Sequence, residues 1–327
     1  MSGALVEACT IAELKALSMP TPCGGRMAKA KRPPYIDRYA SEPVYRIIQR
    51  IADRNRGPVR RAILSAIADT LGETRGRDFT AALASRTIED VLRAVPWDDV
   101  AVPKLQENLT ERLGQIASES GEATNRFIPR EVKLNLDLLN EKAVQWAATR
   151  SAELITVVGN ETKAAIRTMV AEAFQEGIPA RTLGRLIRPL IGLNERQAKA
   201  VVTFGLNLMA EGVSVAETDE RMERYAQRSL RFRAEMIART ETMRAANRGQ
   251  ELNWESAVEE GLIDRTQLVR EWITTPDDRL CPLCEPQDGL RAKIGEPFAL
   301  RQPAEGLADT PNEIHPMCRC AEGLVEA

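Results

Sequence analysis

Four of the six cysteines and the only histidine of this chain lie close together near its C-terminus. Their spacing is Cys281-x2-Cys284 and, thirty residues later, His315-x2-Cys318-x-Cys320. A C-x2-C turn can place two thiolates on one ion at about 2.3 Å, and a second turn can supply the remaining ligands of a tetrahedral site. A small, turn-rich unit also gains from a metal, because it buries little apolar surface by itself. The pattern therefore predicts a C-terminal unit that a structural zinc ion holds together.

The ligand set has one member too many, since tetrahedral zinc takes four ligands and the sequence offers five. The favoured set is Cys281, Cys284, His315 and Cys320, with Cys318 as the alternative to Cys320. Three other interpretations stay open: disulfides formed outside a reducing cell, buried unligated thiols, and a catalytic Cys/His pair. The catalytic pair is the least favoured, because a nucleophilic thiolate needs isolation and a lowered pKa, whereas here several thiols compete for the one imidazole.

The composition limits what else the chain can do. Its 327 residues suggest about two domains, and 43% hydrophobic with 28% charged residues is typical of a globular protein with a core. Aromatic residues make up only 4%, which is few for a protein that stacks on bases or sugars. The formal net charge of −2 excludes nucleic-acid coating along the whole chain, although a local basic patch stays possible.

Neither a membrane segment nor a secretory signal is expected. The longest uncharged run, residues 200–210, is much shorter than the about 20 residues that span a bilayer. The first apolar stretch contains Glu7 and Glu13 and lacks a basic segment before it, so we expect no signal peptide. The cysteines should therefore be reduced thiols.

Helical spacing of apolar residues predicts an almost entirely helical chain up to about residue 262. Gly57-Pro58 should interrupt the first long helix, and Gly72 should end it. A capping-box variant, Asn194 with Gln197, should open a later helix. The further expected helices are three or four over 78–150, one capped by Asn160 that ends at 177–179, a short one over 183–190, one over 195–211, and a long one from about 217 to Gly249.

After residue 261 the pattern changes. Residues 268–273 alternate as in a β-strand, and the rest of the chain is rich in Pro, Gly, Asp and Cys. We therefore expect a mainly α protein, with a helical N-terminal and central region and a small α+β C-terminal subdomain stapled by the Cys/His cluster. The expected division is a helical, basic docking region over 1–155 and a second domain over 156–327, with a helical lead-in at 160–250 and the zinc-knuckle-like part at 262–322.

Residues 26–61 form a basic segment, with eleven basic and three acidic residues. Such a segment is commonly the solvated face of a helix. The functional alternative is an arm that docks on DNA or on an acidic protein surface. The candidate partner-binding residues are Arg46, Arg50, Arg54, Arg60 and Arg61.

The long helix carries the string Arg239-Thr240-Glu241. On a helical wheel Glu241 continues an apolar stripe that begins at Leu230, and Arg239 falls on the opposite face, which also carries Phe232. A charge on an apolar face is costly unless it is paired. We therefore expect buried ion pairs that hold this helix to the C-terminal subdomain, and an active-site carboxylate is the alternative. The expected partners are Asp277, Asp278 and Arg279.

Taken in order, these motifs resemble the phage Mu F-like head morphogenesis family, over about residues 160–322. A lone C-x2-C would be a weak signal, but the ordered set is specific. Its members are Gly192 to Ala198, Ile237 to Glu241, Ala246 to Gly249, Trp272 with Thr275, Asp278 and Arg279, Cys281 to Cys284, Asp288-Gly289, and His315 to Cys320. The structural-motif residues among them are Arg239, Thr240, Glu241, Trp272 and Asp278.

The resemblance implies a minor head protein of a tailed bacteriophage, present in low copy and without enzymatic activity. It would be assembled in the host cytoplasm and would stay inside the head of the virion near the portal. The implied partners are the portal protein, other head proteins and packaged double-stranded DNA.

Two other function classes stay open. An ADP-ribosyltransferase-like enzyme would need Arg239, Thr240 and Glu241 to converge on an open pocket, whereas the helical wheel has them diverge. A zinc-ribbon nucleic-acid-binding module would need basic and aromatic residues around the cysteines. Between residues 280 and 320 Phe298 is the only aromatic residue, so the second class has little support.

Overall fold

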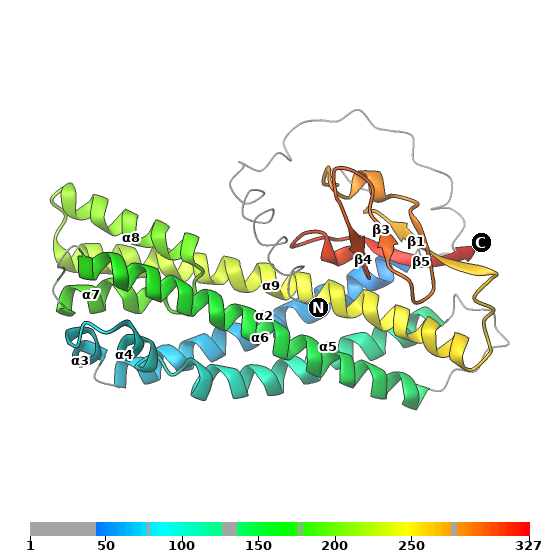
Figure 1. Ribbon diagram of the computed structural model, residues 1–327, viewed down its shortest axis with the longest axis horizontal. Helices are drawn as coiled ribbons and strands as arrows, with labels where there is room; N and C mark the ends of the chain where they lie inside the picture. Colours follow the sequence, from blue (N-terminus) through cyan, green and yellow to red (C-terminus); the bar gives the residue numbers. More distant parts are fainter. Residues whose placement is uncertain (1–43, 77–78, 126–135, 176–177, 179, 276–279) are drawn as a thin grey trace. The chain divides into compact units, whose positions relative to one another are not determined.

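The computed structural model describes residues 44–76, 79–125, 136–175, 178, 180–275 and 280–327 (Figure 1). The protein is 71% helical and has a small antiparallel sheet near its C-terminus, which confirms the predicted mainly α fold class. The α-helices are α2 Val44–Gly76, α3 Phe79–Ala84, α4 Ile88–Arg93, α5 Val102–Thr124, α6 Leu136–Gln175, α7 Ala180–Ile187, α8 Glu195–Ala210 and α9 Val215–Glu259. Among these helices, none combines the length and apolar character that crossing a bilayer requires.

The described chain divides into two compact units that are interleaved in sequence. Unit 1 contains residues 44–55, 114–143 and 239–327, and unit 2 contains residues 56–113 and 144–238. The chain passes from one unit to the other within α2, α5, α6 and α9. The expected boundary at residue 155 falls inside α6. The division into a docking region and a family domain stays a prediction about function.

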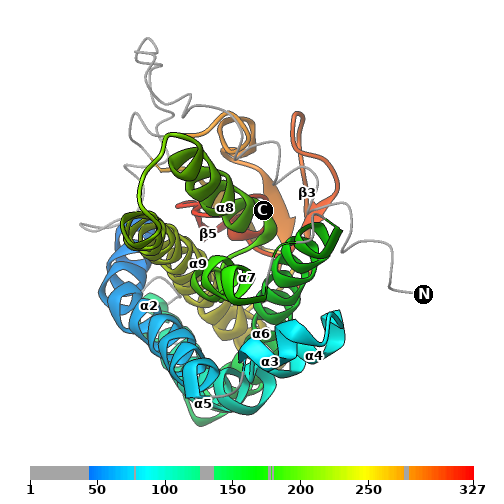
Figure 2. The ribbon, with the colours of Figure 1, turned by 90° about the vertical axis from the view of Figure 1, so that its left-hand side faces the viewer.

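Unit 2 is an assembly of helices around an apolar core. Residues of α3, α4, α6 and α7 form one buried cluster, which includes Phe79, Val91, Ile166 and Leu183. Figure 2 shows α3, α4, α6 and α7 near one another, and α8 beside α9. A π-helical turn, Trp97–Ala101, precedes α5, and a 3-10 turn, Arg188–Leu190, follows α7.

Glycines of unit 2 allow helices and side chains to approach closely. A Cβ on Gly159 of α6 would lie 2.6 Å from Nε1 of Trp97, and one on Gly205 of α8 would collide with the side chain of Met222 on α9. Gly192 has a φ of 88°, in the left-handed region that glycine favours, and stands just before the Asn194 cap of α8. The predicted capping box at Asn194 is confirmed, with the Asn194 side chain accepting a hydrogen bond from the Gln197 backbone.

Unit 1 contains the β-strands. They are β1 Leu268–Ile273, β2 Arg291–Lys293, β3 Phe298–Ala299, β4 Leu307–Ala308 and β5 Ala321–Glu326. β1 is the central strand of an antiparallel sheet in the order β2-β1-β5, and β3 pairs with β4 (Figure 1). The predicted strand over 268–273 is confirmed. Two 3-10 turns, Glu285–Gln287 and Pro311–Glu313, lie in the connections.

The core of unit 1 lies around Trp272 of β1. This indole is fully buried and contacts the ring of Phe298 edge to face, with centroids 5.3 Å apart. Cys284, Cys318 and Cys320 belong to the same buried cluster. The cysteines are thus part of the packed interior of this unit.

Four predicted helix ends were wrong, because packing overrides local signals. α2 continues through Gly57-Pro58 and past Gly72. Val59 and the residues that follow it on the same face are buried. Their burial offsets the cost of about 3 kcal/mol that a proline inside a helix carries. α6 runs unbroken through Asn160. α9 continues past Gly249 to Glu259, because this glycine lies against the backbone of Ala117, where a Cβ would collide.

Candidate metal centre

The Cys281-to-Cys284 turn forms one half of the candidate site. The backbone N–H of Cys284 donates to the Cys281 carbonyl at 3.0 Å and lies 3.3 Å from the Cys281 Sγ. An N–H that points at sulfur favours the thiolate form of that cysteine. The tight turn therefore brings two sulfur atoms together and stabilises negative charge on one of them.

His315 comes to this turn from the second half of the site. Its Nε2 lies 3.1 Å from the Cys281 Sγ and 3.0 Å from the Cys284 Sγ. Its Nδ1 lies 2.7 Å from the carbonyl oxygen of Pro316, which can only accept a hydrogen bond. The proton of the neutral ring therefore belongs on Nδ1, which leaves the Nε2 lone pair directed at the sulfur atoms, as a metal ligand requires.

Cys318 and Cys320 complete the cluster. The sulfur atoms of Cys284, Cys318 and Cys320 lie within 4.8 Å of one another, and so do the ligand atoms of Cys281, Cys284 and His315. Cys284 is common to both groups. The Sγ atoms of Cys284 and Cys318 are 3.7 Å apart, close to the about 3.8 Å that two sulfur ligands show around tetrahedral zinc. The structure thus brings all five predicted ligands together.

The electrostatics of the four thiols explain why a cation fits here. The hydrogen bond with Cys284, together with His315, lowers the pKa of Cys281 to about 4 against the effect of burial. The same hydrogen bond raises the pKa of Cys284 far above its usual range. Burial alone would raise the pKa of Cys318, but its hydrogen bonds with Cys284 and Cys320 outweigh burial and lower this pKa. The pKa of Cys320 is raised, although its hydrogen bond with Cys284 acts to lower it.

Ionisation of Cys281 and Cys318 therefore opposes ionisation of Cys284 and Cys320, because adjacent negative charges repel each other. A divalent cation removes this repulsion and allows every ligand thiol to ionise. The donor set of thiolates and one imidazole is the set that zinc prefers.

Polar side chains hold the second half of the site in place. The Thr240 Oγ1 accepts a hydrogen bond from the backbone N–H of Met317 at 2.9 Å. Asn247 donates to the Cys320 carbonyl at 3.1 Å, and Asn312 donates to the carbonyl of Cys318 at 3.1 Å. α9 therefore positions the His315-to-Cys320 segment directly. Sequence reasoning missed both asparagines, although Asn247 lies in the Ala246-to-Gly249 string that it did select.

The charged residues of the Arg239-to-Glu241 string are placed in part as expected. Glu241 is buried, 3% exposed, and forms an ion pair with Arg244 of the same helix at 3.4 Å. The residues expected as partners, 277–279 and with them Asp278, lie outside the described residues. Phe232, which was expected on a second apolar face, is 55% exposed, so that part of the prediction was wrong.

A second buried polar group lies beside the sheet, and sequence reasoning missed it. Arg270 of β1 is fully buried and forms ion pairs with Glu251 and, at 3.2 Å, with Glu322. It also donates to the Asp309 carbonyl at 2.6 Å, and its guanidinium lies 4.6 Å from the ring centroid of Phe298. The sequence signal was an arginine within the predicted strand over 268–273.

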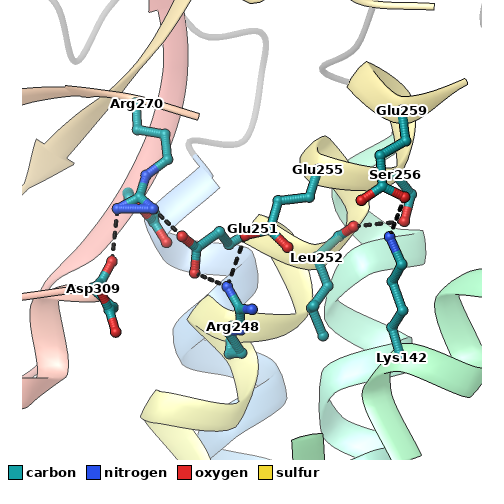
Figure 3. Close-up of polar contacts among 10 residues, drawn as sticks. Lys142, Arg248, Glu251, Leu252, Glu255, Ser256, Glu259, Arg270 and Asp309 are labelled. Carbon is teal, nitrogen blue, oxygen red and sulfur yellow. Dashed lines mark hydrogen bonds and ion pairs between the residues drawn. The ribbon is translucent and has the colours of Figure 1, made fainter. Parts of the chain in front are cut away.

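The group extends along α9 through Arg248, which bonds to Glu251 and, at 3.0 Å, to Glu255 (Figure 3). Burial raises the pKa of Glu322 to about 8 despite the neighbouring Arg270. Burial lowers the pKa of Arg270, but Glu322 and Glu251 outweigh that effect and raise it. Arg248, Arg270 and Glu251 are thus tolerated as buried charges because each has a partner of opposite sign, whereas burial favours the neutral form of Glu322.

The described part of the basic segment lies on α2, and several of its charges are paired within the chain. Arg54 forms an ion pair with Glu119, and Arg60 forms one with Glu235 at 3.0 Å. Arg46 bonds to the hydroxyl of Tyr45. The side chains of all five predicted partner-binding residues, Arg46, Arg50, Arg54, Arg60 and Arg61, are exposed. Residues 26–43 lie outside the described residues, so partner binding by this segment stays a prediction.

Comparison with known families identifies the part of the chain that carries these features. Residues 164–322 match the family described as Phage Mu protein F like protein. Neither the curated proteins nor the solved structures contain a match to this chain. The matched residues include α7, α8, α9, the central strand β1 and the whole Cys/His cluster. Residues 164–322 of this chain thus resemble the phage Mu F-like head morphogenesis family, as the order of its motifs predicted.

Proposed function

We propose that this protein is a minor head protein of a tailed bacteriophage, present in low copy inside the head near the portal. The observation that carries the proposal is the family match over residues 164–322, since the family is one of phage head morphogenesis. Its partners would be the portal protein, other head proteins and packaged double-stranded DNA. The protein would act as a structural component without catalytic activity.

The environment of the Arg239-to-Glu241 string supports a structural role over an enzymatic one. A transferase would need these side chains free to reach a substrate. The Thr240 hydroxyl is instead bonded to the Met317 backbone, and the Glu241 carboxylate is buried beside Arg244. Both groups serve the packing of α9 within unit 1.

The location can be tested by mass spectrometry of purified heads and of subcomplexes that contain the portal. The proposal expects the protein in both, at far fewer copies than the major capsid protein. Absence from both preparations would contradict it. Presence in heads but not with the portal would keep the head role and remove the portal assignment.

The proposed role of the Cys/His cluster is to bind one structural zinc ion through Cys281, Cys284, His315 and either Cys318 or Cys320. The shared position of Cys284 between the two groups of donors supports this proposal. The ion would join β1 and its following turn to the segment before β5. It would supply cohesion, and no reaction is assigned to it.

Metal analysis of protein purified in reducing buffer tests the zinc proposal. About one zinc per chain is expected, and less than about 0.3 would contradict it. Comparing C318S with C320S then identifies the fourth ligand, because loss of a ligand weakens zinc binding strongly whereas loss of a buried neighbour does not. C284S is the positive control, since Cys284 belongs to both groups of donors.

The basic segment is proposed as the docking element, in which Arg46, Arg50, Arg54, Arg60 and Arg61 meet a protein or DNA partner. Its charge of +8 over residues 26–61 supports this, because the chain as a whole is −2. Binding to DNA phosphates should weaken steeply with salt. A flat salt response would assign the segment to a protein partner.

A further inference from the structure

A groove between α8 and α9 in unit 2 gathers positive charge that no part of the proposed function uses. The groove has a volume of about 580 Å³. Its lining includes Arg196, Lys199, Thr203, Phe204, Tyr225 and Arg228. None of the described residues that line it is acidic.

The sequence of α9 explains why Arg228 has no carboxylate beside it. Earlier along this helix, Arg221 pairs with Glu217 at 2.5 Å, and Arg224 pairs with Glu220 at 2.8 Å, each four residues apart. The same step back from Arg228 reaches Arg224, and the step forward reaches Phe232. The pattern of i,i+4 pairs therefore stops where α9 meets the groove.

The two cations of α8 in the groove, Arg196 and Lys199, likewise have no ion-pair partner within the described part of the chain. Arg196 and Lys199 are exposed and three residues apart, so they lie on the same face of the helix. Glu195 stands four residues before Lys199, but within the described part of the chain no ion pair joins Arg196, Lys199 or Arg228 to a carboxylate. Three cations thus share one groove without an ion-pair partner among the described residues, and together they attract anions from outside.

The shape of the groove is fixed by packing beneath it. Gly205 of α8 lies directly against Met222 of α9, which brings the two helices close together. Phe204 meets Tyr225 edge to face, with centroids 5.3 Å apart, and the Arg228 guanidinium lies 5.8 Å from the Tyr225 ring centroid. The aromatic faces are therefore occupied within the groove and are poorly placed to stack on unpaired bases.

We propose that this groove binds the phosphate backbone of double-stranded DNA. Three cations without acidic neighbours suit a row of phosphates, and Thr203 can add a neutral hydrogen bond to a phosphate oxygen. The occupied aromatic rings favour a duplex over a single strand. The arginines of α2 are less suited to this role, because Arg54 and Arg60 are already paired with Glu119 and Glu235.

The test compares two variants of the full chain that lose the same charge. R196Q/K199Q/R228Q removes the cations of the groove. R93Q/R265Q/K293Q removes three exposed cations that lie elsewhere on the chain. All six side chains are exposed, so both variants should unfold at the wild-type temperature, and R228Q alone serves if the triple variant does not fold.

Binding to a labelled duplex of about 30 base pairs is measured by fluorescence anisotropy between about 50 and 200 mM salt. Each phosphate contact contributes about 0.9 to the slope of log K against log salt, so the groove variant should lower the slope by about 2 to 3 and R228Q by about 1. Affinity at about 100 mM salt should fall at least about tenfold. The control variant should keep the wild-type slope, and any contribution of the basic segment cancels in the comparison.

Three results would overturn the inference. The groove variant and the control variant could bind DNA equally well. Single-stranded DNA could bind the groove more tightly than the duplex, or a poly-glutamate peptide could compete as well as the duplex. The experiment needs only purified protein, so its failure leaves the proposed head location untouched, and the location can fail while DNA binding holds.

Discussion

Unit 1 and unit 2 are built from the same long helices, but they bury different kinds of side chain. Unit 2 encloses an apolar cluster around Ile166 and Leu183, and ion pairs such as Arg224–Glu220 lie on its surface. Its buried Arg233 pairs with Glu161, which reaches solvent. Unit 1 instead encloses thiols and an arginine whose carboxylate partners are also buried.

This difference in buried side chains determines how the stability of each unit responds to substitutions and to solution conditions. Apolar contacts are numerous and individually small, so an apolar core loses stability in proportion to the contacts that a substitution removes. When a buried charge or a ligand thiolate loses its partner, the whole interaction is lost in one step. The charge then stays buried without compensation, at a large desolvation cost. Unit 1 should therefore be the more sensitive of the two to single substitutions and to solution conditions.

Removal of the proposed zinc ion should give the largest difference between the units. A structural zinc site contributes about 10 kcal/mol or more to the folding of the unit that contains it. After chelation we expect the amide protons of β1 and β5 to lose protection from hydrogen exchange while those of α7 and α8 keep it. Hydrogen exchange with mass spectrometry measures this. Equal loss of protection in both units, or no loss in either, would show that the metal does not stabilise unit 1 selectively.

Substitution of the buried arginine should come next. R270M leaves Glu322 buried without its cation and Glu251 with Arg248 alone, and we expect it to lower the free energy of unfolding by about 3 to 5 kcal/mol. The triple variant R270M/E251Q/E322Q removes the charges together and should recover part of this loss. Urea denaturation of the zinc-loaded protein measures both. A triple variant that is less stable than R270M would contradict the charge explanation.

Two glycine-to-alanine substitutions should change stability in opposite directions. G249A places a methyl group against the Ala117 backbone and should destabilise by about 1 to 3 kcal/mol. G72A is the matched control, because Gly72 is also helical but has open space around its Cβ position, and alanine there should stabilise by about 0.5 to 1 kcal/mol. Thermal unfolding compares the two. A shift of the same sign in both would refute the packing role of Gly249.

The smallest effect is expected at the surface of unit 2. R221Q removes an exposed i,i+4 ion pair with Glu217 and should cost no more than about 0.5 kcal/mol. The measured change should shrink further at high salt. A loss of several kcal/mol would mean that this unit, too, depends on its ion pairs.

Much of the fold could be predicted from the sequence, because local signals determine it. The period of apolar residues gave the helices, the alternation at 268–273 gave β1, and Asn194 with Gln197 gave the start of α8. The five members of the Cys/His cluster were also selected, because their spacing alone carries the chemistry. The family followed from the order of the motifs.

What could not be predicted depends on contacts between residues distant in sequence. Gly249 resembles a helix end unless one knows that Ala117 lies against it. Arg270 resembles an ordinary strand residue unless Glu251 and Glu322 are known to surround it. The same holds for the groove, because only the packing of α8 against α9 shows that Arg228 lies near Arg196 and Lys199.

The interleaving of the two units has a consequence for the evolution of this protein. The chain crosses between the units within α2, α5, α6 and α9, and residues 164–322 contribute to both units. The family segment therefore lacks part of the hydrophobic core of unit 2, such as Phe79 and Val91, when it stands alone. Recombination that exchanged only this segment between related proteins would place unmatched surfaces together, for example at Ala117 and Gly249. Positions 44–124 should thus co-vary with the family segment and be inherited together with it.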